Sequence, residues 1–220
     1  AFDDFASAPL HEYDVLVPLT IADLEILDAA RHLASRNPLP IPNLASVRLC
    51  DDKLVFNKTM RDHGLGEFIP EFGPSVPWPC VLKKRIDEAG AHTHFALDAE
   101  HARALLAGER ESDYFRQRLV YGTREYTTHL VVAGGRVLYT LHIEVDFAEG
   151  ACIKGRDPCL GARAVSAPCE TSMFASMLAT IGFEGLCCVN YKLERGVPRV
   201  FEINPRMGWN LCAHFAELIP

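Results

Sequence analysis

The sequence contains no long apolar run, no excess of positive charge and neither of the common glycine-rich phosphate loops. Its candidate apolar runs, such as residues 130–133 and 186–189, are far shorter than the roughly 20 residues that a membrane helix needs. With 22 basic and 29 acidic residues the net charge is −7, which gives no general attraction to nucleic acid or to an anionic membrane. We therefore expect neither as a partner. Because the G-x-x-x-x-G-K-S/T and G-x-G-x-x-G motifs are both missing, a nucleotide site would need another design.

Cysteine is present, but not in a pattern that indicates a metal, redox or disulfide framework. None of the eight cysteines forms a C-x-x-C pair. Cys187 and Cys188 are adjacent in a β-type run, so their side chains should point to opposite faces of a strand and act as small hydrophobes. Structural thiols favour a reducing compartment, and we expect a cytoplasmic protein.

The composition is that of an ordinary folded protein. The 220 residues, 49% of them hydrophobic and 23% charged, are enough for one large domain or two small ones. This balance argues against a disordered, collagenous or coiled-coil chain.

The beginning of the chain alternates β-type and helical signals. Residues 13–18 form a short β-rich run, and a helix opens at Thr20 with the spacing of a capping box. A proline-rich turn then excludes helix, so the chain should run extended over 46–49 and start a second helix near Asp51 or Asp52.

The later part of the chain is richer in β-type sequence. Helices are expected at 98–106, at 171–180 and near Trp209. The β-rich runs, mostly separated by glycines, are 79–85, 114–120, 126–133, 136–145, 186–193 and 199–203. Such an order predicts antiparallel meanders in two or three α+β subdomains.

The most informative segment is a hairpin near the C-terminus. A strand that ends at residues 190–192 turns at 194–196 and returns through Glu202 and Asn204, which brings Asn190 toward both. Residues two apart on a strand share a face, so Glu202 and Asn204 should point together while Phe201 and Ile203 point into the opposite, apolar layer. A carboxylate with amide oxygens suits Mg²⁺. Taken alone, however, this pair is more often a solvated strand face than a metal site.

Residues 201–206, Phe-Glu-Ile-Asn-Pro-Arg, closely resemble the C-terminal signature of the ATP-grasp superfamily. Members of this superfamily are mostly ADP-forming carboxylate–amine or carboxylate–thiol ligases. Further landmarks occur in the family's order: Asp-Lys at 52–53, the strand 79–83, and the hinge 115–120 followed by Gly122 and Glu125.

This resemblance implies an α+β fold, in which two ATP-grasp subdomains sandwich ATP. It predicts an N-terminal subdomain at 51–112 and a C-terminal subdomain at 113–220. Residues 1–50 would then be a truncated pre-ATP-grasp α/β segment, too short for the complete domain that normally precedes the grasp.

The same resemblance implies the roles of individual residues. At the nucleotide, Lys53, Lys83 and Lys154 would contact phosphates, and Glu125 would accept a hydrogen bond from the ribose. The adenine edge would lie against the backbone of the hinge, formed by Gln117, Arg118, Leu119 and Val120.

At the reacting end, Glu202, Asn204 and Asn190 would ligate Mg²⁺. Arg206 would stabilise the charge that develops as the γ-phosphoryl moves to a substrate carboxylate. Asn190 stands where the family usually has Asp or Glu, which removes one negative charge from the metal site and should weaken metal binding.

The resemblance therefore predicts an ATP- and Mg²⁺-dependent ligase that activates a small carboxylate as an acyl phosphate and couples it to an amine. Two alternatives remain open: a nucleotide-binding module with little catalysis, favoured by Asn190 and a glycine-poor loop after Lys83, and a kinase built on the same grasp. A homodimer is also left open.

Overall fold

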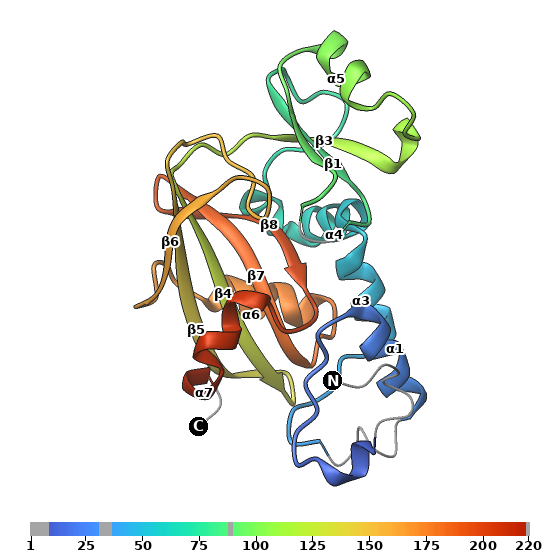
Figure 1. Ribbon diagram of the computed structural model, residues 1–220, viewed down its shortest axis with the longest axis vertical. Helices are drawn as coiled ribbons and strands as arrows, with labels where there is room; N and C mark the ends of the chain where they lie inside the picture. The colour runs from blue at the N-terminus through green and yellow to red at the C-terminus, as the bar shows by residue number, and fades with distance from the viewer. Residues whose placement is uncertain (1–8, 31–36, 88–89, 219–220) are drawn as a thin grey trace.

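The computed structural model describes residues 9–30, 37–87 and 90–218 of the chain. A small antiparallel sheet lies above a larger one, and helices pack beside them (Figure 1). Within the described ranges, none of the helices combines the length and apolar character that crossing a membrane requires. Two predicted segments are described only in part. Outside the described residues lie 1–8 and 31–36 of the predicted N-terminal segment, and 88–89 of the loop after Lys83.

The N-terminal region holds a 3₁₀ turn, Leu10–Glu12, and helix α1, Ile21–Ala29. The capping box predicted at Thr20 is confirmed, because its side chain and that of Asp23 each accept from the other residue's backbone. The strand predicted at 13–18 is wrong. There the backbone of Leu16 donates to and accepts from the side-chain amide of Asn37, at 2.9 and 2.7 Å, instead of pairing with a strand.

Two short helices follow. Helix α3, Leu44–Asp51, corrects the extended segment predicted at 46–49: the side chain of Asn43 accepts from the backbone N–H of Ser46 at 2.9 Å and starts the helix. Helix α4, Lys53–Met60, begins as predicted, with Asp52 capping it through two backbone N–H groups. A π-type turn, Arg61–Leu65, and a 3₁₀ turn, Gly66–Phe68, complete this region.

The small sheet consists of β1 (Cys80–Lys84), β2 (Thr93–Ala96) and β3 (Tyr114–Arg118) in the order β2-β1-β3. Helix α5, Ala99–Leu105, is capped by Asp98 and covers one face, and a 3₁₀ turn, Glu111–Asp113, precedes β3. The buried residues between sheet and helix are Val76, Cys80, Leu82, Ala96 and Ala102. Strand β2 is missing from the sequence prediction, because its short polar segment carries no clear β pattern.

The large sheet has five antiparallel strands in the order β6-β5-β4-β7-β8. Their bounds are β4 Arg124–Ala133, β5 Arg136–Phe147, β6 Cys159–Val165, β7 Gly185–Glu194 and β8 Val197–Asn204. The meander predicted from the β-rich runs is confirmed. Edge strand β6 escaped prediction because almost all of its residues are exposed, so it lacks a buried apolar face.

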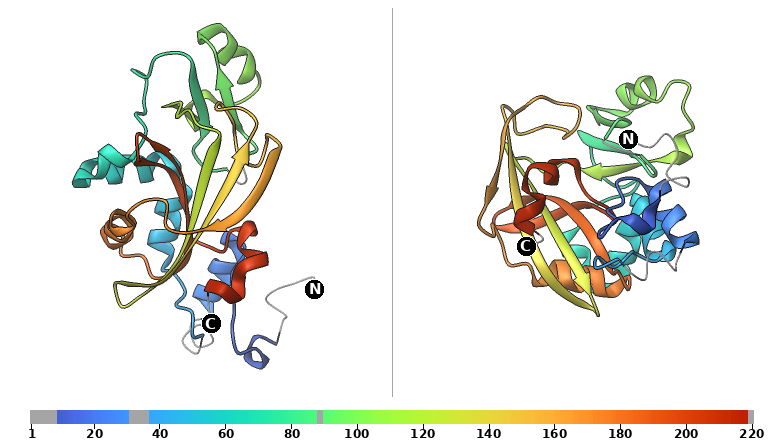
Figure 2. Two further views of the ribbon diagram at one scale, coloured as in Figure 1. Left: turned by 90° about the vertical axis from the view of Figure 1, so that its left-hand side faces the viewer. Right: turned by 60° about the horizontal axis from the view of Figure 1, so that its bottom comes forward.

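One face of the large sheet carries the main core. Helix α6, Ser172–Thr180, buries Phe174 against the ring of Tyr191, with ring centroids 5.0 Å apart. Helix α4 contributes Phe56 to the same core. The last turns, Trp209–His214 and α7 (Phe215–Leu218), lie on the other side of the sheet from α6 (Figure 2). This opposite face carries a smaller apolar cluster beside the last turns, which includes Val131, Leu186 and Leu211, and polar side chains below the small sheet.

Candidate active site

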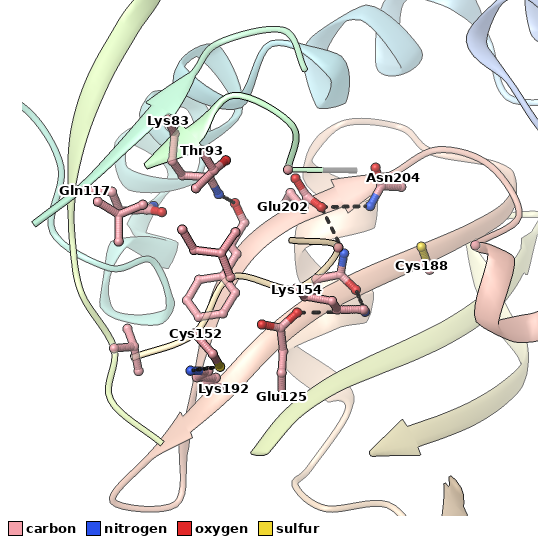
Figure 3. A pocket seen from close by; sticks show the side chains of 18 of the residues that line it. Lys83, Thr93, Gln117, Glu125, Cys152, Lys154, Cys188, Lys192, Glu202 and Asn204 are labelled. Carbon is pink, nitrogen blue, oxygen red and sulfur yellow. Dashed lines mark hydrogen bonds and ion pairs between the residues drawn. The ribbon is translucent and has the colours of Figure 1, made fainter. Parts of the chain in front are cut away.

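A cavity of about 350 Å³ lies between the two sheets, and Figure 3 shows its polar side chains converging from both. The small sheet contributes its face opposite α5, and the large sheet contributes β4, β7 and β8. Eleven of the twelve predicted site residues line this cavity: Lys83, Gln117, Arg118, Leu119, Val120, Glu125, Lys154, Asn190, Glu202, Asn204 and Arg206.

Strand alternation explains why these polar groups meet. On β7, Asn190 points into the cavity while its neighbour Tyr191 is fully buried in the core. On β8, Glu202 and Asn204 point into the cavity while Ile203 is buried. The register pairs Asn190 with Glu202 across the strands, as the predicted hairpin requires.

Phe201 departs from this alternation, and its predicted place in the apolar layer is wrong. Asn190 pairs with Glu202 but Tyr191 pairs with Val200, so a β-bulge leaves Phe201 without a partner and turns it toward the cavity. The ammonium of Lys83 donates to the carbonyl oxygen of Phe201 at 3.1 Å. The bulge thus places a cation-binding carbonyl next to Glu202.

Glu202 is the ionised centre of the site. Its Oε1 accepts from the side-chain amides of Asn190 (2.9 Å) and Asn204 (3.1 Å). Burial raises the pKa of this carboxyl. The charges of Lys53 and Lys83 and the hydrogen bonds from the two amides lower the pKa by more than burial raises it, and bring it to about 2. Glu202 therefore stays charged at neutral pH.

The two predicted phosphate lysines on the N-terminal side have different surroundings. Lys83 lines the cavity, and burial lowers its pKa to about 8, although Glu202 opposes this shift. Lys53 lines a small adjoining hollow instead, where its Nζ donates to the backbone oxygen of Asp87 at 2.6 Å and lies 3.7 Å from Glu202 Oε2. Lys53 thus forms an ion pair with Glu202 from outside the main cavity and favours the ionised form of that carboxyl.

Lys154 reaches the cavity from the loop between β5 and β6. Its Nζ donates to Asn190 Oδ1 at 2.9 Å and to the hydroxyl of Thr127, and lies 3.8 Å from Glu125 Oε1. Burial raises the pKa of Glu125, and the ammonium of Lys154 opposes that rise. The oxygen of Asn190, a predicted metal ligand, is therefore engaged by a lysine.

The hinge end of the cavity contains two buried donors. Gln117 is 2% exposed, and its Nε2 has no hydrogen-bond partner within the described part of the chain. Lys192 is 1% exposed, and its Nζ contacts the carbonyl oxygen of Gly150 and Cys152 Sγ, both at 3.2 Å. Sequence reasoning missed Lys192, although its position two residues after Asn190 on one strand predicts that it shares the cavity face.

The opposite end contains Arg206 and neutral groups. Gly208 is needed here, because an added Cβ would lie 2.9 Å from the His129 ring and 3.0 Å from Cys188 Sγ. Burial lowers the pKa of His129 to about 4, so the imidazole is neutral, and its Nε2 pairs with Asn210 Oδ1 at 3.1 Å.

The donor set suits Mg²⁺ bound together with phosphate oxygens. The described residues contain no group of three or more His, Cys, Asp or Glu side chains that could enclose a metal by themselves. Glu202 offers one ionised carboxylate, and Asn204 offers an amide next to it. Mg²⁺ commonly takes one or two carboxylates and completes its shell with water and substrate phosphates, so this pair fits the ion.

A small antiparallel sheet packed over a larger one, with a polar cavity between them, is the ATP-grasp fold, and solved structures with that fold resemble this chain. The L-amino acid ligase from Bacillus licheniformis matches 92% of this chain and 51% of its own length, with a TM-score of 0.67 and 16% identity. The D-alanine–D-alanine ligase from Bacillus anthracis matches 89% and 70%, with a TM-score of 0.62 and 17% identity. The biotin carboxylase from Campylobacter jejuni matches 94% and 52%, with a TM-score of 0.64 and 13% identity.

These likenesses confirm the fold class that residues 201–206 predict. The chain spans about half the length of the L-amino acid ligase and of the biotin carboxylase. No family model matches the sequence, and no curated protein matches it either. The subdomain limits 51–112 and 113–220 and the roles of the site residues stay predictions.

Proposed function

We propose that this chain is an ATP- and Mg²⁺-dependent ligase that activates a carboxylate as an acyl phosphate, joins it to an amine and releases ADP. One observation carries the proposal: Lys83, Lys154 and Arg206 line a single cavity together with the ionised Glu202, and the hinge strand borders the same cavity. Among the structural neighbours are ligases, and the D-alanine–D-alanine ligase has also been solved with ATP.

The cations of the site suit a transfer between two anions. Moving a phosphoryl group onto a carboxylate brings negative charges together, and ammonium and guanidinium groups in a site of low dielectric reduce that repulsion more than water does. Lys83 and Lys154 would hold the phosphate oxygens, and Arg206 would hold the carboxylate. Glu202 and Asn204 would hold Mg²⁺, which when bound adds positive charge at the phosphate oxygens.

The hinge end suits a purine nucleoside. The backbone of Arg118 and Val120 would hold the edge of the base. Beside it, the Nε2 of Gln117, which has no hydrogen-bond partner among the described residues, offers a buried donor. Glu125 would accept from the ribose. Nucleotide and substrates filling the cavity between the two sheets would limit the access of water that would hydrolyse an acyl phosphate.

A coupled ADP-release assay with Mg²⁺, ATP and pooled carboxylates and amines tests the proposal. We expect turnover in the wild type and a loss of about a hundredfold or more in kcat/KM for Glu202→Gln, because the substitution removes the ionised ligand. Glu111→Gln, at an exposed position that does not line the cavity, is the matched control and should keep full activity. Turnover by Glu202→Gln at a rate near that of the wild type would contradict the proposed function.

The second candidate function is a nucleotide-binding module with little catalysis. It is favoured by the hydrogen bond from Lys154 to Asn190 Oδ1, which takes that oxygen away from a metal. Thermal stabilisation by ATP without ADP release from any substrate pool would support this candidate over the ligase.

Small-molecule carboxylate and amine substrates and a cytoplasmic location complete the proposal. The eight cysteines are all free thiols, and four of them are buried, which suits a reducing compartment.

A further inference from the structure

The ammonium group of Lys154 sits among oxygen atoms from three different residues. It donates to Asn190 Oδ1 at 2.9 Å and to Thr127 Oγ1, and lies 3.8 Å from Glu125 Oε1. Two of these residues lie on β4 and one on β7, so the rigid sheet itself supplies the oxygens. A hydroxyl, an amide oxygen and a carboxylate around one point are ligands that a divalent cation also takes.

The direction of the Asn190 amide is fixed by charge. Its oxygen faces the ammonium of Lys154, and its Nδ2 donates to Glu202 Oε1 at 2.9 Å. The reverse orientation would place an NH₂ group against an ammonium and a carbonyl oxygen against a carboxylate. Asn190 and Asn204 both donate to Glu202 Oε1, but of these two amides only that of Asn190 has its oxygen held by an ammonium, so turning this oxygen toward a metal would break the contact with Lys154.

A second divalent ion beside Asn190 would have to share this space with Lys154. Both cations would compete for the same three oxygens, and they would repel each other inside a partly desolvated cavity. The side chain of Lys154 is 17% exposed and that of Glu125 is 6% exposed, so solvent screens this repulsion poorly.

We propose that Lys154 takes the place of a second divalent ion, so that the nucleotide-loaded site binds a single ion through Glu202 and Asn204. This inference rests on the proposed function, because it concerns the charges that face the phosphates of a bound nucleotide. It also accounts for the neutral Asn190: the lysine already supplies a positive charge, and an amide is enough to hold it.

Two variants distinguish the proposed single-ion site from a site that binds two ions but holds the second one weakly. Asn190→Asp alone adds the carboxylate usual in the family, yet with Lys154 in place the new aspartate should pair with the ammonium and recruit no further ion. Asn190→Asp combined with Lys154→Met frees that carboxylate, and a second ion should then bind. Lys58→Met, which removes an exposed lysine on α4, is the control for loss of one positive charge.

The experiment counts Mn²⁺ bound per chain in the presence of saturating non-hydrolysable ATP analogue, by electron paramagnetic resonance of free Mn²⁺. Pulsed measurements also detect coupling between two neighbouring Mn²⁺ ions. We expect one Mn²⁺ and no coupling in the wild type, in Asn190→Asp and in Lys58→Met, and two coupled ions in the double variant.

Two coupled ions in the wild type, a second ion in Asn190→Asp alone, or no bound Mn²⁺ beside bound nucleotide would each overturn the inference and leave nucleotide binding intact. Failure of the analogue to bind the wild type at all would overturn the proposed function, and the inference with it. Circular dichroism checks that each variant folds. If the double variant does not, the counts for the wild type and Asn190→Asp decide the question.

Discussion

Lys83, a buried lysine that lines the cavity, predicts an unusual pH dependence of nucleotide binding. Burial lowers the pKa of Lys83 from its ordinary value of 10.5 to about 8. If the protonated ammonium binds the phosphates, the affinity for the ATP analogue with Mg²⁺ should be nearly constant below that pH. Above it, the apparent Kd should rise by about tenfold per pH unit, because only the protonated fraction binds well.

The size of the lysine's contribution follows from its surroundings. A charge-assisted hydrogen bond between a buried ammonium and a phosphate oxygen contributes about 3 kcal/mol, which is on the order of a hundredfold in Kd. Lys83→Met should therefore weaken binding by about that factor at pH 7 and remove the alkaline limb of the profile. Lys83→Arg keeps the charge to much higher pH, so it should also lose the alkaline limb while binding more tightly than the methionine variant.

Isothermal titration calorimetry measures the Kd of the ATP analogue for the wild type and both Lys83 variants. The titrations cover about pH 6.5 to about pH 9.5, a range on both sides of the shifted pKa. Lys58→Met provides the control for removing an exposed lysine. The reasoning is refuted if Lys83→Met binds within about threefold of the wild type, or if the alkaline limb persists in that variant.

Three further predictions concern binding and stability. Lys192→Met should raise the Kd of the analogue by about tenfold in calorimetry, because it removes a buried donor at the hinge end; an unchanged Kd would rule out a role in binding. Because the pKa of Glu202 in the fold, about 2, lies below its ordinary 4.5, its contribution is complete above pH 4.5 and is lost as pH falls toward 2. Urea unfolding should show a weaker acid dependence in Glu202→Gln, and equal slopes would contradict this. Phe174→Ala should lower the free energy of unfolding by about 3–5 kcal/mol, whereas a loss below about 1 kcal/mol would contradict its place in the core.

Regular local patterns made much of the site predictable. Glu202 and Asn204 face one cavity because residues two apart on a strand share a face, and the hairpin register brings Asn190 opposite Glu202. Asp52 begins α4 because its side chain accepts the first free backbone N–H groups. Such features depend on a few neighbouring residues, which the sequence displays directly.

Features that depend on distant contacts could not be predicted. The bulge at Phe201 reflects a change of register between β7 and β8, which no local pattern marks. The contact of Lys154 with Asn190 and Thr127 requires the loop after β5 to fold back over β4 and β7. Strand β6 has no buried face, and only its pairing with β5 defines it.

The most direct test of the account is a crystal structure of the chain with Mg²⁺ and a non-hydrolysable ATP analogue. We predict that the triphosphate lies between Lys83, Lys154 and Glu202, with the base against the backbone of Arg118 and Val120 and one Mg²⁺ on Glu202 and Asn204. An analogue bound outside the cavity between the sheets, or with its base at the Arg206 end, would contradict the account.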